Sequence, residues 1–201
     1  MDVLSSALWS SYRLSDYGKL ERLLEQIPTR IKALLLNDAT DTLLHQAVKD
    51  IDLPTIKLLL KHGADPNVIE DGVTVLAPLA RSGNGTKDAL SIAKLFVVDC
   101  KVQVDPGTLH EAVAARFYDL LDYLLSLDYV IEQRLIDQPD DYRQTCLHLS
   151  AIHDSPAITL LLLAHGAHAK LRDRYARTAL NVAKTTDAFR VEVRRSPQLH
   201  P

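Results

Sequence analysis

The sequence has few residues of the kinds that build disulfide frameworks, metal sites or membrane spans. Only Cys100 and Cys146 are cysteines among its 201 residues, and they lie too far apart for a disulfide framework or a pair of metal ligands. Although 47% of the residues are hydrophobic, no run approaches the roughly 18 apolar residues of a membrane span. We therefore expect one domain of ordinary size in a reducing, intracellular setting, cytoplasmic or nuclear, with no membrane partner.

Glycine and N-terminal basic residues are also scarce, and two further classes need them. The chain has seven glycines, and Gly83-Asn84-Gly85 precedes no lysine-serine or lysine-threonine pair. It therefore lacks the pattern of a phosphate-binding loop. The first residues carry Asp2 where a secretory signal would carry lysine or arginine, and serines interrupt their apolar run. We expect neither an NTPase site nor a targeting segment at this end.

One stretch of the chain has the pattern of a helix-turn-helix unit. Thr42–Val48 and Pro54–Lys61 each place apolar residues at i, i+3 and i+4, which is typical of an amphipathic helix. Gly63 follows the second run, where a residue with positive φ commonly ends a helix. Asp71-Gly72 then supplies the chemistry of a tight turn. The stretch is interpreted as a single repeat unit.

This unit recurs along the chain. The leucine of the Thr-x-Leu-His motif stands at positions 44, 76, 109, 147 and 180, which gives spacings of 32, 33, 38 and 33 by subtraction. Thr-x-Leu-His-x-Ala, followed by Leu-Leu-Leu-x-His-Gly-Ala-Asp, resembles the ankyrin repeat, whose period is about 33 residues. The resemblance implies an all-α ankyrin-repeat solenoid of about five to six helix-turn-helix units with degenerate terminal caps. Second helices are expected at Ile56–Leu60, Ile92–Val97, Leu120–Leu125 and Ile158–Leu163.

The spacing of the motifs divides the chain into a single domain, residues 1–193, and a short tail. Its units are a two-helix cap at 3–36, four repeats at 37–70, 71–104, 105–141 and 142–174, a second cap at 175–193 and the tail at 194–201. The third unit is a poor match, because its motif lacks the histidine and the small residue that follows it. The connection at 126–145 is long, with 22 positions from Leu125 to Leu147. Insertions in a repeat array often lie on the binding face, but neutral drift in an exposed loop is an equal alternative.

The eight histidines do not predict a metal or catalytic site. The resemblance gives five of them structural roles in the motifs: His45, His62, His110, His148 and His165. No carboxylate or cysteine completes a metal spacing beside the others. Cys146 and His148 are the residue types of a thiolate and its base, but Cys146 occupies a turn position, and the sequence indicates no oxyanion site. We expect no catalytic residues, no metal and no cofactor.

Charge is distributed unevenly along the chain. Residues 164–201 hold eight basic and three acidic residues, a net of +5, and since the whole chain carries −3, residues 1–163 carry −8. This distribution would orient a partner electrostatically, or it is ordinary surface charge that keeps the protein in solution. An acidic body without aromatic residues among the basic ones does not favour nucleic acid as a partner.

The resemblance also implies where another protein would bind. Ankyrin repeat proteins generally use the loop tips and the concave face of the first helices. The tips would contain Asn67, Ile69, Glu70, Asp71, Asp140, Asp141, Tyr142, Arg143, Arg172, Asp173, Arg174 and Tyr175; Lys49, Arg81, Tyr118 and His153 lie near the exposed ends of first helices. Tyrosine and arginine dominate binding hot spots, which favours Tyr142, Arg143, Arg174 and Tyr175.

The function expected from the resemblance is a non-catalytic protein-protein interaction module, monomeric by itself. The alternatives are a regulatory or inhibitory subunit, and a targeting module or effector, of a larger assembly. An enzyme built on an ankyrin frame is the least favoured alternative. Its active site would have to lie in the poorly matching third unit or in the 126–145 connection.

Overall fold

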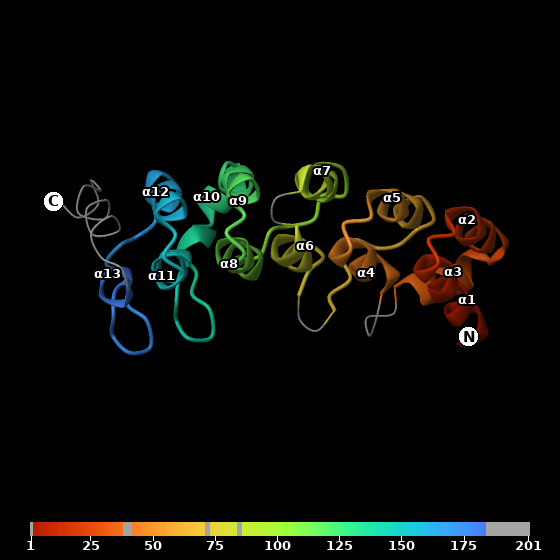
Figure 1. The fold of residues 1–201 in the computed structure, drawn as a ribbon, viewed down its shortest axis with the longest axis horizontal. Coiled ribbons are helices and arrows are strands. Elements are labelled where there is room, and N and C mark those ends of the chain that lie inside the picture. The colour runs from red at the N-terminus through yellow and green to blue at the C-terminus, as the bar shows by residue number, and fades with distance from the viewer. Residues whose placement is uncertain (1, 38–41, 71–72, 84–85, 184–201) are drawn as a thin grey trace.

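The helices are arranged in two layers along an elongated stack, with α1 and α13 at opposite ends (Figure 1). The computed structural model describes residues 2–37, 42–70, 73–83 and 86–183. The inner layer contains α1 (Asp2–Arg13), α4 (Leu43–Lys49), α6 (Leu76–Ser82), α8 (Pro106–Ala114), α11 (Cys146–Ile152) and α13 (Ala179–Val182). The outer layer contains α2 (Tyr17–Gln26), α5 (Leu53–Lys61), α7 (Lys87–Lys94) with the π-helical turn η1 (Leu95–Asp99), α9 (Tyr118–Leu125) and α12 (Pro156–Ala164).

The turn from an inner to an outer helix is built in the same way in several units. A residue with positive φ follows the inner helix at Ser15 (53°), Ile51 (58°), Arg116 (57°) and Asp154 (49°). A single left-handed residue reverses the chain sharply, so the next helix packs back against the one before it. The positive φ of Ser15 shows that the turn between α1 and α2 has the same conformation as in the units that carry the motif, although this unit lacks the motif residues.

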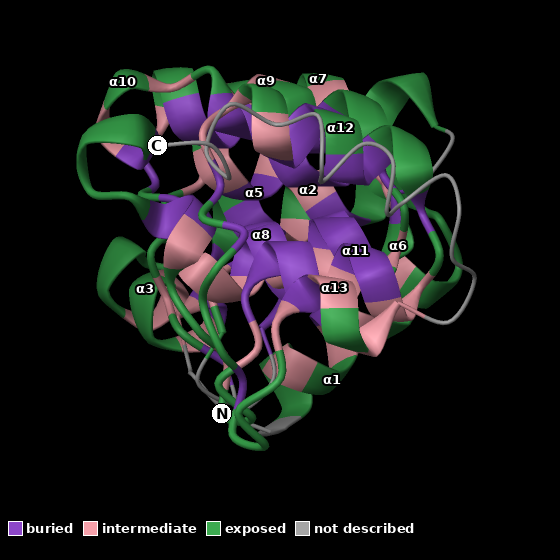
Figure 2. Cartoon of the chain, turned by 90° about the vertical axis from the view of Figure 1, so that its left-hand side faces the viewer, coloured by how far each residue is buried: buried purple, intermediate pink, exposed green. Residues whose placement is uncertain are grey.

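Small side chains lie where the two layers meet. Ala47, Ala112 and Ser150 are fully buried, and a larger side chain at these positions would push the layers apart. Seen along the stack, buried residues gather between the layers, whereas the loops below them are largely exposed (Figure 2). Each helix pair therefore shares a thin aliphatic core with its neighbours.

Two segments that the sequence analysis treated as cap or connection contain further helices. The N-terminal cap has a third helix, α3 (Thr29–Leu36), so the prediction of a two-helix cap is wrong. The long connection contains α10 (Asp128–Glu132) and the 3-10 turn η2 (Leu135–Asp137), which bury Val130, Leu135 and Ile136. Residues 184–193 of the C-terminal cap, and the tail, lie outside the described residues, and the unit boundaries remain predictions.

Gly83, the residue that ends α6, lies where no side chain fits. A Cβ built on it would lie 2.5 Å from the Ala89 Cβ and 2.8 Å from the Leu79 carbonyl oxygen. We expect Gly83→Ala to lower the free energy of unfolding by about 2 kcal/mol, since overpacking forces backbone shifts. Urea unfolding followed by far-UV circular dichroism measures this change.

Gly18→Ala is the matched control for Gly83→Ala. Gly18 is exposed in α2, and the nearest atom to its Cβ would be 3.7 Å away. This substitution should leave stability unchanged or raise it, because alanine favours helix. Equal losses for the two variants would show that the close approach at Gly83 is not the cause.

Candidate protein-binding surface

Among the described residues, three loops lead to the next inner helix and project below the inner layer (Figure 1). We call them finger 1 (residues 66–70 and 73–74), finger 2 (residues 139–145) and finger 3 (residues 170–178). The connection at residues 100–105 is shorter and leads directly to α8, whose N-cap Asp105 accepts a hydrogen bond from the Thr108 N–H at 2.9 Å. The fingers therefore form one pair near the C-terminal end and a separate finger near the middle.

Fingers 2 and 3 are closed by the same hydrogen bonds. In finger 2, one carboxylate oxygen of Asp140 accepts from the backbone N–H groups of Tyr142 (2.8 Å) and Gln144 (2.7 Å). In finger 3, Asp173 accepts in the same way from Tyr175 (2.8 Å) and Arg177 (2.9 Å). These aspartates fix the backbone of each tip, as Asx turns do.

The structure corrects the prediction for Asp173 and refines that for Asp140. Asp173 is 3% exposed, and its second carboxylate oxygen lies 2.8 Å from Arg177 Nη2. It is therefore a buried residue that holds the finger backbone in place, and not an exposed residue that would contact a partner. Asp140 is half-buried and has the same hydrogen-bond pattern. Both aspartates position the exposed residues that follow them.

The two fingers bring their tyrosines together around one arginine. The Arg174 guanidinium carbon lies 5.3 Å from the Tyr142 ring centroid and 5.6 Å from the Tyr175 ring centroid. Arg177 lies 4.9 Å from the Tyr175 ring. The backbone N–H of Arg174 also donates a hydrogen bond to the backbone carbonyl of Tyr142 at 3.1 Å. We name Tyr142, Arg174, Tyr175 and Arg177 the finger cluster.

The finger cluster is exposed although its members contact one another. Tyr142 is 56% exposed and Tyr175 is 65% exposed. Tyr142, Arg174 and Tyr175 are among the residues predicted from the sequence, but Arg177 is not, although its position four residues after Asp173 could have indicated it. Arg143, with φ 57°, and Arg172, whose Nη1 donates to the Ala176 carbonyl at 2.6 Å, lie exposed on the same two fingers, as does Asp141.

Finger 1 differs because its acidic residue points inward. Asn67 and Ile69 are exposed, but Glu70 is 6% exposed. Its carboxylate accepts from Lys49 Nζ at 2.9 Å and from the Thr42 N–H at 3.2 Å, and it lies 3.4 Å from His45 Nδ1. The prediction of Glu70 as an exposed tip residue is therefore wrong, and Asp71 lies outside the described residues.

Burial and hydrogen bonding oppose each other at Glu70. Burial by itself would raise the pKa of Glu70, but the hydrogen bonds from Lys49 and Thr42 and the positive charge of Lys49 hold it below its ordinary value. The His45 pKa is also lowered, chiefly by burial. The pair therefore favours a charged carboxylate beside a neutral imidazole at neutral pH.

We expect Glu70→Gln to lower the free energy of unfolding by about 1.5 kcal/mol near neutral pH, because the charge-assisted bond to Lys49 is lost. A carboxylate with a depressed folded pKa stabilises the protein above its unfolded pKa of about 4.3, and this contribution is lost as the pH falls through the folded pKa. The difference between wild type and variant should therefore shrink in acid. Urea unfolding at several pH values tests this dependence.

The control for Glu70→Gln is Glu132→Gln, which neutralises an exposed carboxylate on α10. Its unfolding free energy should match that of the wild type at each pH, since isolated surface charges contribute little. A Glu70→Gln variant with a pH-independent deficit would contradict the assignment of the carboxylate charge.

The remaining predicted residues lie at different places. Lys49, the last residue of α4, pairs with Glu70, and Arg81 on α6 donates from Nε to Glu111 at 3.1 Å. The His153 carbonyl accepts a hydrogen bond from Arg116. Tyr118, expected near the exposed end of a first helix, is the first residue of the outer helix α9, because the left-handed Arg116 has already reversed the chain.

The residues considered for chemistry are engaged in the fold. Cys146 is fully buried, and burial raises its pKa to about 12, which keeps the thiol protonated. His148 is held between Thr145 Oγ1 (2.9 Å) and the Arg177 carbonyl (3.0 Å). In the described parts of the chain, no three His, Cys, Asp or Glu side chains gather closely enough to hold a metal ion. None of the helices seen there is both long and apolar enough to span a bilayer.

The layered helix pairs and projecting fingers define a helical repeat solenoid. A family model described as "Ankyrin repeats (many copies)" matches residues 130–183, and a model described as "Ankyrin repeat" matches residues 40–68. The chain is an ankyrin repeat protein, which confirms the resemblance and the all-α solenoid.

Two curated relatives and one solved structure resemble the chain. The putative ankyrin repeat proteins FPV018 and FPV022 of Fowlpox virus (strain NVSL) are 24% and 30% identical over 82% and 74% of this chain. The matched parts cover 28% and 25% of those proteins, so the chain spans about a quarter of their length. The structure of the Bd0816 predatory endopeptidase from Bdellovibrio bacteriovorus in complex with immunity protein Bd3460 contains a similar chain. The match has a TM-score of 0.72 and 21% identity, and it covers 94% of this chain and 97% of that one.

Proposed function

We propose that the chain is a non-catalytic module that binds another protein through the finger cluster and the neighbouring exposed ends of the inner helices. The observation that carries this proposal is the exposed stack in which Arg174 lies between Tyr142 and Tyr175. Tyrosine and arginine are enriched at binding hot spots. A stack that is already formed needs little ordering when a partner arrives, which lowers the entropic cost of association.

The charges around the cluster favour an acidic segment of the partner. Fingers 2 and 3 expose Lys170, Arg143, Arg172 and Arg174 against Asp141, while Asp173 neutralises Arg177 across 2.8 Å. A surface with this excess of positive charge speeds association with an acidic segment and disfavours a basic one. The finger cluster would then supply the stacking contacts at its centre.

The proposal is tested by capture from a cell lysate with the full chain and with Arg174→Glu. Proteins that the wild type retains and the variant loses are candidates for the partner, and mass spectrometry identifies them. The control is Lys87→Glu, which reverses an exposed charge at the start of α7 in the outer layer. Identical captured sets for the wild type and Arg174→Glu would reject the finger cluster as the binding site.

Inhibition of an enzyme is a second candidate function, favoured by one comparison. The solved structure that the chain resembles is a complex between a peptidase and an immunity protein. If a captured partner is an enzyme, its activity should fall as the full chain is added, and Arg174→Glu should restore it. If the enzyme retains full activity in the complex, the inhibitory function is rejected and the adaptor function is favoured.

A further inference from the structure

A hollow of about 830 Å³ lies at the N-terminal end of the stack, between the α1–α2 turn and the α4–α5 turn. Three aromatic side chains and three charged ones line it: Trp9, Tyr12, Tyr17, Arg13, Asp50 and Asp52. We call it the aromatic hollow. No motif in the sequence marks it, because its two halves come from units about 38 residues apart, the separation of Tyr12 from Asp50.

The two carboxylates of the aromatic hollow have only uncharged donors. Asp50 accepts from the Gln46 amide at 3.0 Å and from the Tyr12 hydroxyl. Asp52 accepts from the Thr55 N–H at 3.1 Å and the Thr55 hydroxyl at 2.7 Å. The Tyr17 hydroxyl donates to Asp52 at 3.4 Å. Among the described residues, no lysine, arginine or histidine forms an ion pair with either carboxylate.

The negative potential in the hollow acts on its own tyrosines. The charge of Asp52 is the main cause that raises the pKa of Tyr17. The pKa of Tyr12 is raised strongly, first by burial and then by the hydrogen bond and charge of Asp50. With two carboxylates against the single positive charge of Arg13, the hollow carries a net negative charge, which attracts a cation and repels phosphates or acidic peptides.

The aromatic rings select the kind of cation. Trp9 and Tyr12 meet edge to face, with centroids 6.3 Å apart and an interplanar angle of 82°. The guanidinium carbon of Arg13 lies 5.7 Å from the Trp9 ring centroid, so one ring of the hollow already accepts a guanidinium. A planar guanidinium stacks on aromatic faces and forms bidentate bonds with carboxylates, whereas an ammonium is a compact, strongly hydrated charge.

We propose that the aromatic hollow binds an arginine side chain of a protein partner, stacked on its rings and paired with Asp50 and Asp52. The proposal rests on the proposed function only because its ligand belongs to a protein. The helices whose turns line the hollow, α1, α2, α4 and α5, lie near the N-terminal end of the stack, and fingers 2 and 3 lie near the C-terminal end (Figure 1). The two sites are therefore tested independently. Together they would orient a partner that is basic at one end and acidic at the other.

Trp9 is the only tryptophan in the chain, so its fluorescence reports on the aromatic hollow. The full chain is titrated with the peptide acetyl-Gly-Arg-Gly-amide at low ionic strength, where charge pairs are least screened. We expect a saturable change in Trp9 emission. The matched peptide with glutamine in place of arginine should produce none, and the lysine peptide should bind more weakly.

Variants assign the binding to the named groups. The double substitution Asp50→Asn/Asp52→Asn should weaken arginine-peptide binding at least about fivefold. Asparagine can keep the cap of α5, so the fold should be retained. Arg13→Gln should strengthen binding, because it removes the competing guanidinium, while Glu132→Gln and Arg174→Glu should leave it unchanged. Circular dichroism checks that each variant is folded.

Several results would overturn the proposal. These are the absence of a saturable signal with the arginine peptide, an equal response to the glutamine peptide, and unchanged binding by the folded double variant. Tighter binding of the lysine peptide would also overturn it, because the choice of arginine rests on stacking. None of these results depends on Arg174, so each leaves the finger cluster untouched.

Discussion

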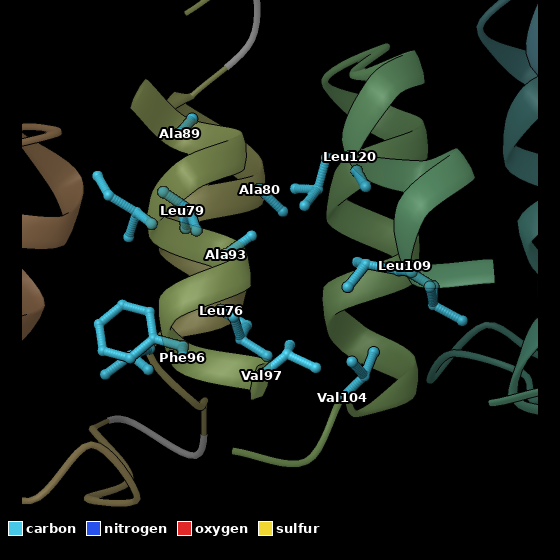
Figure 3. Close-up of a cluster of buried hydrophobic side chains, with 14 of the residues drawn as sticks. Leu76, Leu79, Ala80, Ala89, Ala93, Phe96, Val97, Val104, Leu109 and Leu120 are labelled. Atoms are coloured by element: carbon cyan, nitrogen blue, oxygen red, sulfur yellow. The ribbon is translucent and has the colours of Figure 1, made fainter. Parts of the chain in front are cut away.

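Replacing Phe96 with alanine should lower the free energy of unfolding by about 3 to 5 kcal/mol, the cost of removing a large buried aromatic side chain. Phe96 lies in the π-helical turn η1 and is fully buried. Figure 3 shows its ring on the side of the preceding unit, while Val97 points toward α8 and Val104. The turn therefore places two consecutive side chains against two different neighbours. Urea unfolding followed by circular dichroism measures the loss.

The position of Phe96 in a repeat array also predicts where the loss will act. Because each unit contacts only its neighbours, the cavity should weaken α6 and α7 before it reaches α11 and α12. Amide hydrogen exchange should show that α6 and α7 lose protection first. Phe96→Leu, which keeps most of the volume, should cost less than about 1.5 kcal/mol. Uniform loss of protection along the chain would contradict the local effect.

The fold could be predicted from the sequence because its main determinants are local and repeated. The motif leucines Leu44, Leu76, Leu109 and Leu147 are all at most 2% exposed. Their spacing marks each inner helix, and the aliphatic run that follows marks each outer helix. A pattern repeated every 33 residues or so specifies a stack, since one pair of short helices cannot bury its apolar face alone.

The extra helices and the role of Glu70 could not be predicted in this way. The segments that form α3 and α10 match no repeat position, so only packing against neighbouring units shows that they are helical. Glu70 precedes Asp71-Gly72, a pair whose sequence favours a turn, where acidic residues are usually exposed. Its burial depends on Lys49 and the backbone of Thr42, which lie 21 and 28 residues earlier in the chain. Contacts between units determine such positions.

The finger cluster lies between these two cases. Tyr142 and Tyr175 are 33 positions apart, one repeat length, so they occupy equivalent tips of neighbouring units. The sequence did not indicate that Arg174 would insert between the rings. That geometry depends on Asp140 and Asp173, which fix the two tips with matching hydrogen bonds. The aromatic hollow had no such signal, because it joins the cap to the first clear repeat.

The double substitution Tyr142→Ala/Tyr175→Ala should weaken binding to the captured partner at least about 100-fold, equivalent to about 2.7 kcal/mol. Both rings are more than half exposed, and both stack on Arg174, so their removal also frees the guanidinium that they hold. The affinity is measured by isothermal titration calorimetry. The melting temperature should change little, because neither ring belongs to the core and the finger backbones keep their aspartate hydrogen bonds.

The control for the double variant is Tyr118→Ala, which removes an exposed tyrosine from the outer helix α9. It should bind the partner as the wild type does, because the outer layer lies away from the fingers. Arg174→Lys adds a finer test: it keeps the charge but removes the planar group that stacks on both rings, and should recover only part of the affinity lost in Arg174→Ala. If the double variant instead loses stability in proportion to its loss of affinity, the two tyrosines are packing residues that join the fingers. The binding surface would then have to lie elsewhere on the inner layer.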